Sequence, residues 1–412
     1  MARRMFTLAF VALLFANPAA ADPPPLPTTG AVVPGLAAFD ELMASFLVEH
    51  EIPGAAVCIS RKGRIVYARG FGYADLDTRT PVAPDALFRI ASVSKPVTAV
   101  AIMQLVERGA ITLDDNPFAI MGRAATLERD GVDQRLRDVT IRHLLQHTGG
   151  FDRSASFDPM FQYERIAKAM GVPSPPTHDA IVDYMLGRPL DFDPGTRYAY
   201  SNFGYCVLGR VVEAVTGETY EQSVQSAVLE PLGVTTMRIG LSLPEERVAG
   251  EVTYYDAKRR SGRPVHDPSR TVPRPYCIDH AVMDSHGAWI ASAVDLVRFA
   301  DALNAPAQSP LLRSPSIEAM FAPPAGSAGH DDDGDVRSSW YGFGWLVRPA
   351  GDSENTWHNG RINGTSSLLV RRHDGLNWAV LFNTDLANDG STPAGLIDGL
   401  MHRAARKADW PQ

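Results

Sequence analysis

The chain has 412 residues, of which 45% are hydrophobic and 21% charged, and its formal net charge is −8 at pH 7. This profile excludes a disordered or collagen-like chain and a disulfide-rich mini-protein, and the length is ample for a sizeable core. An acidic balance without a Lys/Arg block also argues against nucleic acid as the main partner.

Residues 1–21 are predicted to be a signal peptide, which implies export to the periplasm or the medium. Arg3 and Arg4 precede an apolar run from Met5 to Ala16, and Ala19-Ala20-Ala21 resembles a cleavage site. The run is too short to span a bilayer, so no stable membrane anchor is expected. The alternative is an anchor or a buried first helix. Residues 22–34 are then a Pro-rich leader, predicted to be extended and mobile.

The elements that follow begin with a helix and a hairpin. Apolar side chains recur at helical spacing from Leu36 to Leu47 and predict an amphipathic helix. Two β-rich runs, 55–60 and 64–70, are joined at Lys62-Gly63, a turn typical of a β-hairpin. Residues from about 85 to 340 are mostly helical in pattern, interrupted by Pro/Gly loops.

Strands return near the C-terminus. Strands are predicted at residues 341–347, 366–371 and 377–383. A closing helix is predicted at 393–406, with Thr392 as its N-cap. This order predicts one α/β (α+β) catalytic domain over 35–412. An antiparallel sheet is built from both chain ends, about 35–84 and 341–412, with helices packed on it and a largely helical inserted region of about 85–340.

The three cysteines do not settle the redox chemistry of the chain. An odd number leaves at least one thiol unpaired. The favoured interpretation is that the cysteines pack as small buried hydrophobic residues, and the alternative is a single disulfide. The three residues are Cys58, Cys206 and Cys277.

No metal or organic cofactor is expected. His143 and His147 have the i, i+4 spacing of a zinc site, but no third ligand presents itself. The acidic run 331–335 lacks the ligands that a calcium loop needs at its first and twelfth positions, so a solvated loop is predicted. The chain also has no G-x-S-x-G, H-E-x-x-H, dinucleotide or P-loop motif.

Ser92-Val93-Ser94-Lys95 is the first motif that carries chemistry. It opens an apolar run, Val97 to Val106, that is typical of a buried central helix, and Pro96 is tolerable only in a first turn. Residues i and i+3 share a helix face, so Lys95 can reach Ser92. A lysine made less basic by burial can take the serine proton, and the helix N-terminus suits a developing oxyanion.

Two further motifs lie downstream. Tyr200-Ser201-Asn202 supplies a phenol and an amide, and His358-Asn359-Gly360 opens a C-terminal strand region where a glycine permits close backbone approach. With these motifs in this order, the chain resembles the penicillin-recognising serine hydrolases, the group of class C β-lactamases, D-Ala-D-Ala carboxypeptidases, D-aminopeptidases and related esterases. The resemblance covers nearly all of the chain after the leader.

The resemblance implies a β-lactamase/transpeptidase-like fold and a site without a metal. It makes Ser92 the nucleophile that forms an acyl-enzyme, Lys95 its proton partner, and Tyr200 the general base in acylation and deacylation. Asn202 would orient Lys95 and the substrate carbonyl. The oxyanion hole would be the backbone N–H groups of Ser92 and Arg361.

His358 and Gly360 match the first and third positions of a strand motif that is usually Lys-Thr-Gly. A neutral imidazole binds an anion more weakly than an ammonium does. The sequence therefore predicts acyl transfer more strongly than it predicts β-lactam hydrolysis. A peptidase or amidase on D-amino-acid-type peptides is favoured. A carboxylesterase, a β-lactamase and a binder without turnover are the alternatives. We hypothesise that the Arg361 side chain grips a substrate carboxylate; a solvent-facing charge is the competing interpretation. The partner is a small-molecule or peptide substrate, and the sequence does not give the oligomeric state.

Overall fold

The computed structural model describes residues 26–410. Within these residues the main sheet is antiparallel, in the spatial order β1-β3-β2-β14-β13-β12-β11-β10, with β4 paired to β3. The strands are β1 (Thr28–Thr29), β2 (Gly54–Arg61), β3 (Arg64–Asp75), β4 (Thr80–Pro81), β10 (Trp340–Tyr341), β11 (Leu346–Ala350), β12 (Ser353–Ile362), β13 (Thr365–Arg371) and β14 (Leu376–Phe382). β2 pairs with β14, so the sheet is completed by both chain ends as the sequence predicts.

The local sequence explains the centre of this sheet. The predicted hairpin is confirmed: Lys62 and Gly63, with φ of 52° and 75°, join β2 to β3, and two positive φ values are what a tight type I′ turn requires. All residues of β14 and all but the last of β2 are buried. Strands covered on both faces need nearly continuous apolar side chains, which both runs have.

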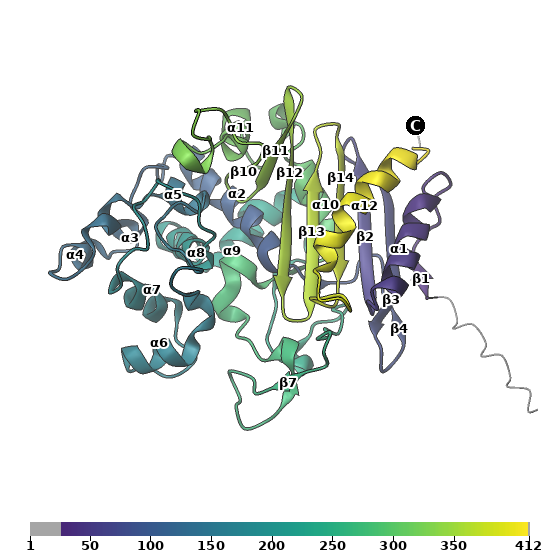
Figure 1. Cartoon of the computed structure of the whole chain (residues 1–412), viewed down its shortest axis with the longest axis horizontal. Helices are drawn as coiled ribbons and strands as arrows, with labels where there is room; N and C mark the ends of the chain where they lie inside the picture. The colour runs from purple at the N-terminus through teal and green to yellow at the C-terminus, as the bar shows by residue number, and fades with distance from the viewer. Residues whose placement is uncertain (1–25, 411–412) are drawn as a thin grey trace, which may run out of the picture.

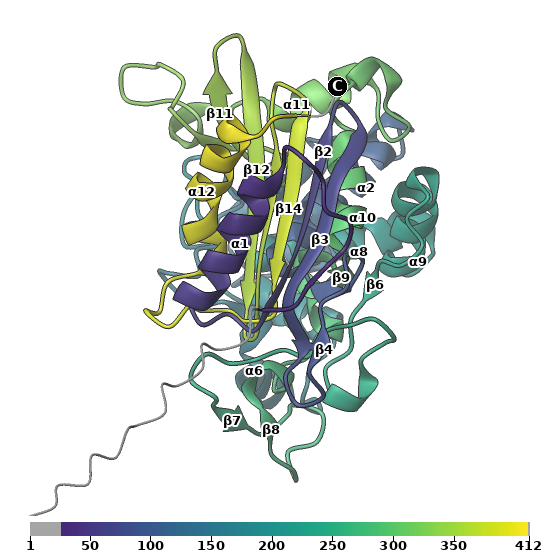
Figure 2. The ribbon, with the colours of Figure 1, turned by 90° about the vertical axis from the view of Figure 1, so that its right-hand side faces the viewer.

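Helices cover both faces of the sheet (Figures 1 and 2). On one face α1 (Ala37–Glu49) and α12 (Pro393–Lys407) lie side by side and share an apolar core with the sheet. The other face carries α10 (Ala293–Asp301), beyond which lies the helical region with α2 (Ser94–Glu107) at its centre. The second and larger core lies there.

The inserted region is more mixed than predicted. Its remaining helices are α3 (Pro117–Ile120), α4 (Ala124–Leu127), α5 (Ile141–Leu145), α6 (Tyr163–Met170), α7 (His178–Leu186), α8 (Asn202–Thr216), α9 (Tyr220–Val224) and α11 (Ser314–Phe321). Two small sheets lie among them, formed by β5 (Phe88–Arg89), β9 (Trp289–Ala291) and β6 (Arg238–Ile239), and by β7 (Ser261–Gly262) and β8 (Val272–Pro273). Strands of two or three residues are too short to leave a period-2 pattern in the sequence.

Three predicted elements differ from the structure. The leader is attached to the sheet in its described part, because Thr28–Thr29 pairs with β3. The predicted strand 341–347 is two strands separated by a turn in which Gly344 (φ +81°) packs against the first turn of α2. Thr392 precedes α12 as predicted, but its hydroxyl makes no capping hydrogen bond. The predicted signal peptide, 1–21, lies outside the described residues.

All three cysteines are free thiols, so the disulfide alternative is wrong. Cys58 and Cys206 are buried, as small apolar residues would be, and Cys277 is half-buried. No helix in residues 26–410 has the length and apolar character needed to cross a bilayer.

Candidate active site

Ser92 lies at the junction between a short 3-10 turn, η1 (Ala91–Val93), and α2. Ala91 has a φ of +47°, a left-handed conformation that costs a non-glycine residue of order 1–3 kcal/mol and that often marks functional sites. The segment is fixed in place because Ser367 of β13 donates to the Ile90 carbonyl at 2.7 Å. Ser92 is partly exposed, whereas the first turn of α2, including Pro96, is buried.

Lys95 is fully buried and its amine contacts three oxygens. Nζ lies 3.2 Å from Ser92 Oγ, 2.9 Å from Asn202 Oδ1 and 2.8 Å from the carbonyl of His286. Burial lowers the pKa of Lys95 well below its usual range. A neutral amine keeps two N–H groups, which the amide and carbonyl oxygens accept, and its lone pair is then directed at Ser92. The geometry therefore suits an amine that takes the serine proton.

Tyr200 and Asn202 reach the same point from the start of α8. The Tyr200 hydroxyl donates to Ser92 Oγ at 2.7 Å, and Ser201 caps the helix by accepting from the Gly204 N–H at 3.1 Å. Burial raises the pKa of the Tyr200 phenol, with the hydrogen bond to Ser92 opposing it. A phenol with a raised pKa stays protonated near neutral pH, so in the resting site Tyr200 holds the proton that it donates to Ser92 and is not yet a base. The geometry therefore favours Lys95 over Tyr200 as the base in acylation, which differs from the role that the resemblance implies.

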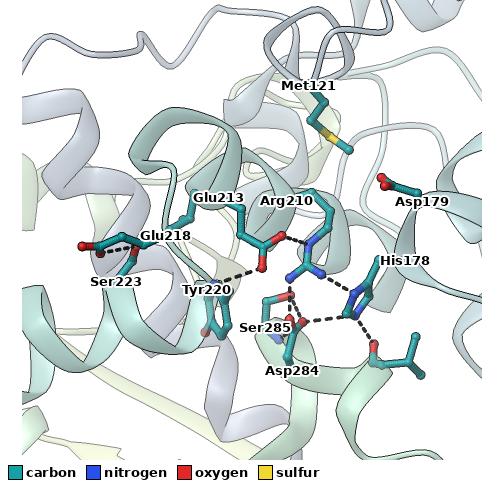
Figure 3. Close-up of polar contacts among 12 residues, drawn as sticks. Met121, His178, Asp179, Arg210, Glu213, Glu218, Tyr220, Ser223, Asp284 and Ser285 are labelled. Atoms are coloured by element: carbon teal, nitrogen blue, oxygen red, sulfur yellow. Dashed lines mark hydrogen bonds and ion pairs between the residues drawn. The ribbon is translucent and has the colours of Figure 1, made fainter.

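The His286 carbonyl belongs to a single π-helical turn, η9 (Asp284–Ala288), that packs against α2 and α8. Figure 3 shows how this turn is fixed: Arg210 of α8 forms a buried ion pair with Asp284, and His178 contacts both side chains. Glu213 forms a second ion pair with Arg210, with Oε2 3.1 Å from Nε. The carbonyl that holds Lys95 thus sits on a turn anchored by charge pairs.

The third motif lies on β12. Burial lowers the pKa of His358 to about 3, so its ring is neutral, and Nε2 lies 2.9 Å from the Tyr341 hydroxyl. Gly360 packs directly on the nucleophile segment: a Cβ added there would meet the Ile90 carbonyl oxygen at 2.2 Å. The first residue of β11, Leu346, pairs with Trp357, so in the described chain β12 from residue 358 onward has one edge free of strand pairing.

The Arg361 side chain is not brought to this cluster. Gly360 pairs with Ser367, whose hydroxyl points at Ile90 beside the nucleophile, whereas Arg361 pairs with Ser366, whose hydroxyl accepts from the first turn of α12 on the opposite face. Side chains of successive strand residues point to opposite faces, and Arg361 is exposed. This placement argues against the carboxylate clamp hypothesised for this side chain. Its backbone N–H stays a predicted oxyanion donor.

Several residues at the site were not predicted as site residues. Asp158 accepts from Asn202 Nδ2 at 2.7 Å, and the Arg153 guanidinium lies 4.5 Å from the Tyr200 ring centre. The His147 ring centre is 4.4 Å from those of Tyr200 and Tyr341. None of these unpredicted residues belongs to the three motifs that carry the resemblance, at 92–95, 200–202 and 358–360.

The other sequence candidates have structural roles. His143 Nδ1 accepts from the Thr140 N–H at the start of α5 at 3.3 Å, and His147 Nδ1 accepts from the Ser201 N–H at 3.2 Å. Asp331 accepts backbone N–H groups within its own loop. In the described part of the chain, no group of three or more His, Cys, Asp or Glu side chains could hold a metal ion.

Comparison with known proteins decides the family. A family model described as Beta-lactamase matches residues 37–398, which is most of the chain. The chain belongs to this family. Its members are serine hydrolases, and the β-lactamase/transpeptidase-like fold predicted from the motifs is confirmed.

Curated proteins similar to this chain are named for different activities. Esterase EstB of Burkholderia gladioli is 34% identical over 54% of this chain and 55% of its own length. Penicillin-binding protein 4* of Bacillus subtilis is 28% identical over 79% of this chain and 66% of its own length. For these two relatives, the matched region therefore spans between half and two thirds of the relative.

A solved structure shows the same fold. D-amino acid amidase from Ochrobactrum anthropi superposes with a TM-score of 0.67 at 21% identity, over 91% of this chain and 98% of that one. At this identity the likeness shows the fold and not the substrate.

Proposed function

We propose that the protein is an exported serine hydrolase that works through an acyl-enzyme on Ser92 and cleaves amide bonds of D-amino-acid-type peptides. The observation that carries the proposal is the pair of contacts on Ser92 Oγ, one from the buried Lys95 amine and one from the Tyr200 hydroxyl. A serine needs an adjacent base to become a nucleophile, and a departing amine needs an acid. The export part rests on residues 1–21 alone.

Acylation follows from these positions. Ser92 Oγ attacks the substrate carbonyl carbon while its proton moves to the neutral Lys95 amine, which becomes an ammonium held by Asn202 and His286. The oxyanion is predicted to accept from the backbone N–H groups of Ser92 and Arg361. The intermediate collapses by breaking the bond to the leaving group, which takes the Tyr200 proton. Proton return from Lys95 restores the phenol.

Deacylation uses the same three residues, and the proton transfers between them run in the opposite direction. A water molecule takes the place of the leaving group, attacks the ester carbonyl carbon and gives a proton to Tyr200 as that phenol passes its own to Lys95. The ammonium then returns a proton to Ser92 as the acyl–oxygen bond breaks. The products are a carboxylic acid and free enzyme, and no cofactor is consumed.

The preference for amides rests on Tyr200 and the choice against β-lactams on His358. An amine leaves poorly unless it is protonated, and the protonated Tyr200 phenol beside Ser92 supplies that proton. A neutral His358 offers no cation for the carboxylate of a β-lactam. A carboxylesterase is the second candidate because the 34% identical relative is an esterase.

A hydrolysis panel tests the proposal. It contains matched D- and L-amino-acid anilides, D-Ala peptides, nitrophenyl esters and a chromogenic β-lactam, each assayed with the wild type and Ser92→Ala. We expect D-anilides to be cleaved faster than L-anilides, with no turnover by the variant. Ester hydrolysis without anilide hydrolysis would favour the esterase. Folded protein that no acylating probe labels would favour a binder without turnover.

A further inference from the structure

Asp158 lies on the far side of Asn202 from Lys95. It precedes the short turn η3 (Pro159–Phe161) and accepts the Met160 N–H at 3.2 Å, which fixes the carboxylate. Asn202 donates from Nδ2 to Asp158 at 2.7 Å and accepts at Oδ1 from Lys95 at 2.9 Å. The two ends of an amide have nearly the same shape, so their orientation is set by the partners. A carboxylate accepts only, so it forces the amide nitrogen toward itself.

We infer that Asp158 is a positioning residue for Lys95, holding Asn202 with its oxygen toward the amine, and that Asp158 and Arg153 together set the charge state of that amine. This inference rests on the proposed function, because the charge state of Lys95 matters to the reaction only if Lys95 takes the Ser92 proton. It adds two residues that the sequence motifs do not contain.

In the described chain, Asp158 and Arg153 are the two charged groups near Lys95. The rings of Tyr200 and Tyr205 lie 4.8 and 5.6 Å from Nζ, and burial raises the pKa of both phenols. Burial lowers the pKa of three further groups near the site, the imidazoles of His147, His286 and His358. All five groups are therefore neutral near pH 7.

Asp158 and Arg153 act on Lys95 in opposite directions. After burial, which lowers the Lys95 pKa, the negative charge of Asp158 raises that pKa and the positive charge of Arg153 lowers it. Asp158 has 15% of its side chain exposed and Arg153 has 46%, with the guanidinium 4.0 Å from the carboxylate. Water screens the more buried charge less. Removing the charge of Asp158 and removing that of Arg153 should therefore shift the Lys95 pKa by different amounts, each in a known direction.

NMR of the lysine side chains measures the pKa of Lys95 directly. Lysine occurs in the chain only at 62, 95, 168, 258 and 407, so a protein labelled with 13C at lysine Cε gives few signals. The Lys95 signal is identified by its loss in Lys95→Arg. We expect the titration midpoint of this signal to fall in Asp158→Asn and to rise in Arg153→Gln, each by about one pH unit. Asparagine keeps an oxygen for Asn202, so the charge changes while the contact is retained.

Matched control variants remove a charge elsewhere. Arg197→Gln removes a cation of similar exposure, 44%, that pairs with Asp152, and Asp133→Asn removes a carboxylate of similar exposure, 13%, that pairs with Arg135. Neither should move the Lys95 midpoint. Equal midpoints in the wild type, Asp158→Asn and Arg153→Gln overturn the inference. Arg153→Gln changes a half-exposed side chain, so it still tests the inference if Asp158→Asn fails to fold.

The pH dependence of kcat/KM for a nitrophenyl ester separates this inference from the proposed function. Activity requires neutral Lys95, so the acid limb should move to lower pH in Asp158→Asn and to higher pH in Arg153→Gln, as the NMR midpoints do. If hydrolysis depends on Ser92 but neither the acid limb of kcat/KM nor the NMR midpoint of Lys95 moves in the variants, the inference is overturned and the proposed function stands. Moved midpoints in a protein without Ser92-dependent hydrolysis support the charge balance and refute the proposed function.

Discussion

Replacing Gly360 with alanine should damage both stability and turnover. A Cβ at this position would lie 2.2 Å from the Ile90 carbonyl oxygen and 2.3 Å from Ser367 Oγ, whereas Cβ contacts under 3.0 Å are essentially never seen. The strand or the nucleophile segment must therefore move by about 3.0 − 2.2 = 0.8 Å. Overpacking of this kind costs about 1–3 kcal/mol of the free energy of unfolding.

The displacement falls on the segment that carries the nucleophile, because Ile90 lies two residues before Ser92 and bonds to Ser367. A misplacement near 1 Å can reduce a rate by about 100-fold, so we expect kcat to fall by up to about that factor. Denaturant melts measure the first effect and steady-state kinetics on the best panel substrate the second.

Gly399→Ala is the matched control. Gly399 is exposed on α12, and a Cβ there meets only Arg403 at 3.7 Å, so this change should stabilise the protein by about 0.5–1 kcal/mol through helix propensity. If Gly360→Ala matches the wild type in stability and kcat, β12 does not press on the nucleophile segment and the account of this strand is wrong.

Three further predictions concern single groups. Tyr200→Phe should lower kcat/KM on anilides by about 100-fold or more and on activated esters by much less, because a good leaving group does not need the phenol proton; equal losses would contradict the acid role. Arg361→Ala should change KM equally for substrates with a free and an esterified carboxylate, since its side chain faces away from Ser92; a selective loss on the free acid would restore the clamp. The free energy of unfolding should fall as the pH drops below about 6.5, by up to about 1.4 kcal/mol per pH unit for each buried neutral histidine, because the unfolded chain binds protons that the native state does not. Urea melts between pH 8 and 5 measure this, and a stability that rises toward pH 5 would contradict the neutral state of these groups. The histidines concerned, whose pKa burial lowers, are His147, His280, His286 and His358.

The sequence was informative where local chemistry determines structure. The Lys62-Gly63 turn needs two positive φ values and predicted its hairpin, and the position of Pro96 predicted the start of α2. The motifs at 92, 200 and 358 were expected at one site, and the first two make direct contact. These features depend on short-range rules of turn, helix and residue chemistry.

The missing parts of the site depend on long-range packing. Asp158 and Arg153 lie in loops, where no periodicity marks a residue, and the His286 carbonyl is a backbone group that every residue possesses. The hypothesis for the Arg361 side chain was made without knowing that Gly360 faces the nucleophile segment. Once that face is known, strand alternation places Arg361 on the opposite side.

The central claim, an acyl-enzyme on Ser92, is tested most directly by mass spectrometry of protein quenched during turnover of a nitrophenyl ester. We predict an adduct with the mass of the acyl group on the peptide that contains Ser92, formed with a burst of nitrophenol and absent in Ser92→Ala. Turnover in which that peptide is never modified, or an adduct that persists on the same peptide in Ser92→Ala, would contradict the account.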